Sequence, residues 1–233
     1  MKKAFTMLEL IAVILVVAIL SIVLIPRFSD SKLREAADQI ISHIRYTQHL
    51  AMIEEKYIPD PSLSDEDGAV EKSKNARYWY KSFWEIHFHT SGTHAPTYSV
   101  YSDSATATAG NAAYDGNPKN ADLIAVNPQN KLRMCGLASS TSSIPDSEID
   151  TSLRLGKKFG LTSLTVTNNC GTNRFLFDSF GRPYCNTPTS SETTKYFFDS
   201  DDRLTSTAQI RLCIDTDCRT ISIEPETGYV HMD

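Results

Sequence analysis

Apolar residues dominate the start of the chain. The 22 residues from Ala4 to Ile25 contain one charged side chain, Glu9; Lys2 and Lys3 precede this run and Pro26 ends it. As a helix, the run would extend about 33 Å at about 1.5 Å per residue. It is therefore long enough to cross the hydrocarbon core of a membrane.

Two common explanations of such a run fit less well. A secretory signal has an apolar core of about 7 to 15 residues and a small-x-small cleavage site, and neither is present. A plain membrane anchor explains the length, and Lys2 and Lys3 would keep the amino terminus in the cytoplasm and place the rest outside. An anchor leaves Glu9 unexplained, because an acid within a membrane span costs about 2 to 3 kcal/mol.

A helical pattern resumes after Pro26 and continues to about Lys56. Apolar residues recur at steps of three, four or seven, at Leu33, Ala37, Ile40, Ile44 and Ala51. The two segments together predict one helix of about 50 residues and about 75 Å, whose outer half packs on a sheet. We expect His43 and His49 to be surface or helix-packing residues rather than metal ligands.

Alternating patterns predict β-strands in the remainder. Trp84, Ile86 and Phe88 alternate with polar residues, as in a half-buried strand, and the TYSVYSD segment places Tyr98 and Tyr101 on opposite faces. Further strands are predicted at 124–126, 164–167, 174–177, 208–214, 220–223 and 228–231. Turns are expected at Gly181, Pro225 and Gly228. The predicted fold is α+β, with a long amino-terminal helix packed on an antiparallel sheet.

Polar segments interrupt this pattern. Residues 58–76 read as a loop, and the acidic cluster Asp65 to Gly68 within it lacks the spacing of an EF-hand, so solvated acids are the favoured interpretation over calcium ligands. Segments 103–122 and 137–150 are rich in Ala, Ser, Thr, Asn and Gly. We expect both to be surface insertions.

All five cysteines follow the predicted membrane segment, where an oxidising compartment favours disulfides. Cys213 and Cys218 flank the IDTD turn, so a bridge across a hairpin is expected. Cys170 and Cys185 are the better pair among the other three, which leaves Cys135, although sequence alone does not fix the connectivity.

His87 and His89, with His94 nearby, form the best candidate metal site, because two histidines on one strand face can share an ion. No Asp, Glu or Cys at a diagnostic distance completes the set, and any polar strand face produces the same pattern. We therefore expect no metal and no cofactor.

The charge pattern excludes several functions. The formal charge is −5, and residues 57–233 hold 16 basic and 22 acidic residues, so general attraction to nucleic acid or anionic lipid is not expected. The chain has no nucleophile elbow, phosphate loop or paired-acid constellation. We therefore do not expect the protein to be an enzyme.

The segment KKAFTMLELIAVILVVAILSIVLIPRF resembles the class III signal and first helix of type IV prepilins and type II secretion pseudopilins. The resemblance implies cleavage between Ala4 and Phe5 and N-methylation of Phe5. Glu9 and Pro26 then occupy mature positions five and twenty-two, where the family has them, whereas Ala4 replaces the usual Gly. The implied organisation is a leader (1–4), a transmembrane assembly helix (5–26), an outer helix (27–56) and a β-rich periplasmic head (57–233).

Cleavage would create a cationic amine about one helical turn from Glu9. In a filament, the amine of one subunit could pair with the carboxylate of its neighbour and set the axial register. The competing local interpretation is that a helix amino terminus favours a negative charge. Pro26 lacks the amide that would bond to Ile22, so we expect a kink or a loosened turn there.

The segments RFLFDSFGRPY, RTISIEPETGYVHM and ISHIRYTQHLAMIEE resemble minor pseudopilins of the GspH/FimT type. This implies a minor subunit of a type II secretion or type IV pilus filament, with prepilin peptidase, an inner-membrane assembly platform and other pilins as partners. It also implies a single-pass inner-membrane location with a periplasmic head, and the bulky insertions favour the filament tip. A DNA-binding minor pilin and a membrane-anchored metal-binding protein are the alternatives; the acidic head argues against nucleic acid.

Overall fold

The computed structural model describes residues 7–54, 82–103, 106–108, 111–113, 116–120, 122–185 and 202–233. The predicted leader, the cleavage site at Ala4 and Phe5, and the acidic cluster at 65–68 lie outside these ranges. Side chains are described in them except at 22–29, 106–108 and 111–113.

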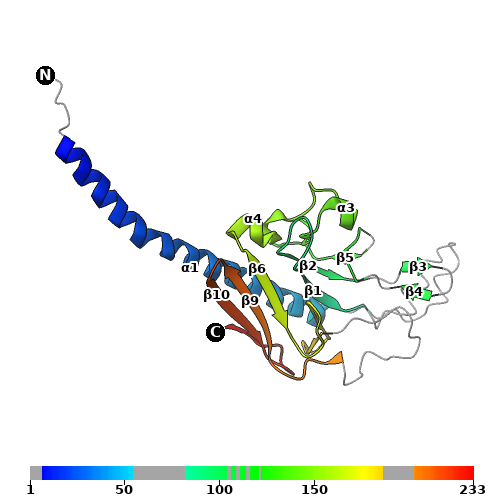
Figure 1. The fold of residues 1–233 in the computed structure, drawn as a ribbon. Coiled ribbons are helices and arrows are strands. Elements are labelled where there is room, and N and C mark those ends of the chain that lie inside the picture. Colours follow the sequence, from blue (N-terminus) through cyan, green and yellow to red (C-terminus); the bar gives the residue numbers. More distant parts are fainter. Residues whose placement is uncertain are drawn as a thin grey trace.

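One helix, α1 (Met7–Ile53), spans 47 residues and continues through Pro26 as helix. Its amino-terminal half projects away from the head, whereas its carboxy-terminal half is embedded in it (Figure 1). The predicted apolar stripe is confirmed, because Leu33, Ala37, Ile40, Ile44 and Ala51 are all buried. Within the described residues, no helix meets the combined length and apolarity needed to span a membrane.

The described part of the head contains two larger antiparallel sheets. The first has the order β5-β2-β1-β7-β8, formed by β1 (Trp84–His89), β2 (Thr97–Ser102), β5 (Leu123–Ile124), β7 (Arg174–Phe177) and β8 (Pro183–Tyr184). The second has the order β11-β10-β9-β6, formed by β6 (Ser163–Thr167), β9 (Ala208–Ile214), β10 (Asp217–Ile223) and β11 (Val230–Met232). A separate hairpin pairs β3 (Thr106–Thr108) with β4 (Asn111–Ala113). The α+β class is therefore confirmed.

The outer half of α1 contacts strands of both sheets, and one hydrophobic cluster joins the three layers. Polar contacts fix the end of the helix. Arg45 donates to the Val230 carbonyl (2.9 Å), and Gln48 Nε2 donates to the carbonyls of Gly181 (2.7 Å) and Thr227 (3.0 Å). These bonds hold the Gly181 and Gly228 turns against the helix; both turns were predicted, and both glycines have positive φ.

The first sheet differs from the prediction in one respect. The strand β1 was predicted to be half-buried, but His87 is its one residue that is not buried, because a second hydrophobic cluster covers the other face. That cluster includes Tyr101, Cys135, Ile144 and Ile149. The prediction that 137–150 is merely a surface insertion is therefore wrong, since this segment packs on the sheet.

Most other strand positions are confirmed, with small shifts at the ends. The strands β7 and β9 have the predicted bounds, β10 begins three residues before the prediction, and β5 ends two residues before the predicted Val126. Sequence patterns did not predict α3 (Ser139–Ser142), the 3-10 turn Thr151–Leu153, α4 (Leu155–Phe159) or β8. Each is too short to show a periodicity.

Candidate functional site

The projecting half of α1 is apolar on every side. Large apolar side chains from Leu10 to Leu20 are 51% to 60% exposed, with no face covered by the head. A helix that is hydrophobic all round requires burial by lipid or by other protein. We name residues 7–21 the apolar rod.

Two polar groups in the apolar rod have different environments. Ser21 donates its hydroxyl hydrogen to the Val17 carbonyl (2.7 Å), so it needs no outside partner. Glu9 is the sole charged side chain of the rod, and it is exposed. Its carboxylate is therefore accessible from outside the chain.

A pocket of about 360 Å³ opens beside the carboxy-terminal end of β1. His87 and His89 line it together with His94, Asn117 and Asn173. The two strand imidazoles lie side by side, with ring centroids 4.2 Å apart. The structure therefore brings to one cavity the three histidines that the sequence grouped as a candidate site.

Hydroxyl groups of β2 fix both strand imidazoles. The Tyr101 hydroxyl lies 3.4 Å from His87 Nδ1, and Ser99 Oγ lies 3.2 Å from His89 Nε2. Burial lowers the pKa of His87 to about 2 and of His89 to about 4, and the Arg174 guanidinium contributes to both shifts. Both rings are uncharged at neutral pH.

A buried ion pair lies behind the pocket. Arg174 Nη1 contacts Glu85 Oε2 at 3.2 Å, and Arg174 Nη2 donates to the Gly116 carbonyl (3.1 Å). Glu85 is 1% exposed and its Oε1 has no hydrogen-bond partner within the described part of the chain. Burial raises the pKa of Glu85, against the opposing effect of Arg174.

Within the described ranges, no group of three or more His, Cys, Asp or Glu side chains is arranged to hold a metal ion. Cys135, next to this region, is buried and unpaired, and Ser99 Oγ donates to its sulfur at 3.9 Å. Burial raises the pKa of the Cys135 thiol, which favours an inert thiol.

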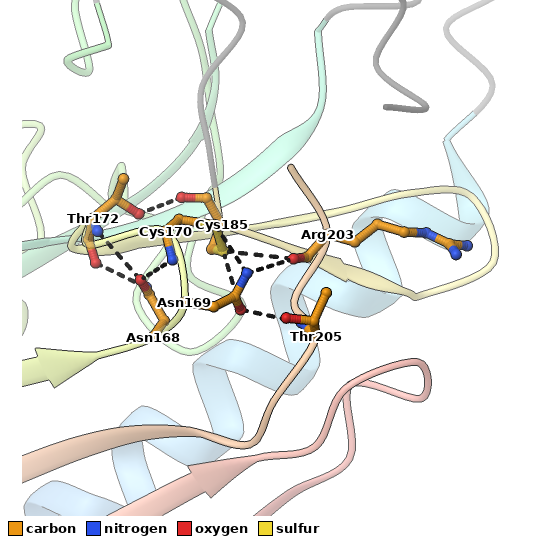
Figure 2. Close-up of a disulfide and its surroundings, with 7 residues drawn as sticks. All are labelled: Asn168, Asn169, Cys170, Thr172, Cys185, Arg203 and Thr205. Atoms are coloured by element: carbon orange, nitrogen blue, oxygen red, sulfur yellow. Dashed lines mark hydrogen bonds between the residues drawn. A yellow bond between two sulfur atoms is a disulfide. The ribbon is translucent and has the colours of Figure 1, made fainter. Parts of the chain in front are cut away.

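Both predicted disulfides are confirmed. The Cys213–Cys218 bridge joins directly opposed residues of β9 and β10. The Cys170–Cys185 bridge lies among polar contacts (Figure 2). Asn169 Nδ2 donates to the Arg203 carbonyl (2.9 Å), and the Thr205 amide donates to Asn169 Oδ1 (3.1 Å). The bridge therefore joins the segment before β7 to the chain after β8, and the hydrogen bonds of Asn169 link the same segment to Arg203 and Thr205.

His43 packs at the junction of α1 and β2. Its Nδ1 lies 2.6 Å from the hydroxyl of the fully buried Tyr98, to which Gln39 Nε2 also donates (2.8 Å). Of the two predicted roles, helix packing is thus confirmed. Burial lowers the pKa of His43 to about 4; Asp150 opposes this and Lys158 adds to it.

We expect His43 to make the head sensitive to acid. Because its pKa in the folded chain lies below the ordinary histidine value of 6.5, its contribution is fully present above pH 6.5 and is lost as the pH falls toward 4. At about 1.4 kcal/mol per pH unit, this amounts to about 2 to 3 kcal/mol. Urea unfolding at pH 7 and 4.5 should show a smaller loss for His43→Gln than for the wild type. Equal losses would contradict this assignment.

Family models, curated proteins and solved structures were all compared with the chain. None matches.

Sequence reasoning missed Asn117, Thr141, Asn173 and Arg174 as neighbours of the histidines. They come from three distant segments, brought together by the strand order β2-β1-β7 and by the covering segment. Of these four residues, only Arg174 could have been noticed in the sequence, because it is a charged residue that begins an otherwise apolar strand.

Proposed function

We propose that this protein is a minor pilin or pseudopilin, a non-enzymatic subunit that joins a membrane-based filament through its first helix. The observation that carries the proposal is the apolar rod, which continues without a break into the helix at the centre of the head. Such a rod is unstable in water, because each large apolar side chain left exposed loses the favourable free energy of burial, about 1.5 to 3 kcal/mol.

The resemblance to prepilins implies the proposed order of events. Before assembly the rod resides in the inner membrane, with Lys2 and Lys3 in the cytoplasm and the head in the periplasm. The proposed membrane span is residues 5–26; the structure describes its backbone from Met7 and its side chains from Met7 to Ser21. Cleavage at Phe5 then allows rods of neighbouring subunits to pack together, with Glu9 opposite the new amine of a neighbour.

Two features of the head support this arrangement. Its disulfides suit an oxidising compartment outside the cytoplasm. Its connection to the rod is continuous helix, the outer half of α1 belongs to the same core as both sheets, and Arg219 of β10 pairs with Asp30.

Photo-cross-linking tests the packing of the rod. A photoreactive amino acid replaces Val13, 51% exposed in the rod, in cells that assemble the filament; the control replaces Thr165, exposed on β6. We expect Val13 to yield adducts with other pilin-like subunits, absent when the assembly machinery is deleted. Adducts with lipid alone under assembling conditions would indicate a plain anchor and would contradict the proposal.

A further inference from the structure

We propose that the pocket beside β1 binds one divalent transition-metal ion through His87 and His89, with His94 as a third ligand recruited from the pocket rim. Zinc and copper are the class of ion that imidazole nitrogen favours. The filament function neither requires nor predicts this site.

The strand places the first two ligands. Residues two apart on a strand point to the same face, and here the rings are adjacent, with 4.2 Å between centroids. Tyr101 and Ser99 contact Nδ1 of His87 and Nε2 of His89. The opposite nitrogens, Nε2 of His87 and Nδ1 of His89, are therefore the ones that can bind an ion. Such hydroxyl contacts orient the rings as outer-shell partners of metal ligands do.

The charges around the pocket oppose and permit a cation in turn. The positive charge of Arg174 lowers the pKa of both histidines, so an ion binds against it. Among the described residues, no Lys or Arg lines the pocket itself, and Arg174 behind it is paired with Glu85. The Gly116 carbonyl near this strand accepts a hydrogen bond from Arg174.

His94 supplies the third ligand through movement of its loop. Three preassembled ligands are not present in the described part of the chain, so the ion first meets the two strand histidines and water. His94 lies in the loop between β1 and β2, close to Gly92 at φ +106°, and lines the same pocket. The pocket, at about 360 Å³, has room for an ion with its water ligands, each occupying about 30 Å³.

Metal titration of the full-length protein in detergent tests the site, with Zn²⁺ and Cu²⁺ as probes. Calorimetry should show one ion per chain, with Cu²⁺ bound more tightly than Zn²⁺. His87→Ala and His89→Ala should each weaken binding at least about tenfold, and His94→Ala should weaken it less. His49→Ala, which removes an exposed histidine of α1, is the matched control and should change nothing.

Pulsed electron paramagnetic resonance of the Cu²⁺ complex gives a second readout, the number of imidazole nitrogens bound. Two or three in the wild type, and fewer in His89→Ala, would support the site. Thermal unfolding of each apo variant separates loss of binding from loss of fold. Absence of saturable binding, or equal binding by a folded His87→Ala/His89→Ala variant, would overturn the proposal and leave the filament function untouched.

Discussion

Replacing Glu9 by alanine is expected to leave the protein in the membrane fraction but to remove it from filaments. Removing one member of a buried ion pair costs about 3 to 5 kcal/mol, because the other charge stays buried without a partner. At about 1.4 kcal/mol per tenfold change, incorporation should fall about a hundredfold or more. Filaments sheared from cells and probed for the head give the measurement.

The matched control for this variant lies on the same helix. Glu35→Ala removes an exposed acid from the outer half of α1, beyond the apolar rod, and should assemble normally. Normal incorporation of Glu9→Ala would show that Glu9 serves only the helix terminus, the competing local interpretation.

Gly136→Ala is expected to destabilise the head strongly, although it adds only one methyl group. A Cβ at this position would lie 1.8 Å from Thr97 Oγ1 and 2.6 Å from the Tyr98 carbonyl oxygen. Thr97 cannot simply rotate away, because its hydroxyl donates to the Leu153 carbonyl (2.9 Å). The Gly136 amide and carbonyl are themselves bonded to Ser99 and Arg154, so the backbone has little room to shift.

We expect a loss of about 3 kcal/mol or more for Gly136→Ala, which is about 6 to 12 °C in Tm for a domain of this size. Gly160→Ala is the control. A Cβ there meets nothing within 4 Å, but φ is +77°, so the cost should be about 1 kcal/mol. Circular dichroism melting of the purified variants measures both, and an unchanged Tm for Gly136→Ala would contradict the packing described for this segment.

Local patterns predicted much of this fold. The apolar stripe on α1 could be predicted, because a helix that packs on two sheets must repeat apolar residues every three or four positions, as Leu33, Ala37 and Ile40 do. The Cys213–Cys218 bridge could be predicted, because the hairpin turn lies in the four residues between the two cysteines. These features depend on neighbours in the chain.

Features made by distant segments were not predicted. The second face of β1 carries Glu85, His87 and His89, which read as solvent-facing residues until the segment containing Ile144 and Ile149 is packed over them. That segment is rich in Ser and Thr, so its composition indicated a surface loop. For the same reason the pocket emerged only from the three-dimensional arrangement.

Mass spectrometry of the mature amino terminus tests the central claim most directly. In cells with active prepilin peptidase, the account predicts a chain that begins at Phe5 and carries one N-methyl group. A purified chain that still begins at Met1 in such cells would contradict it.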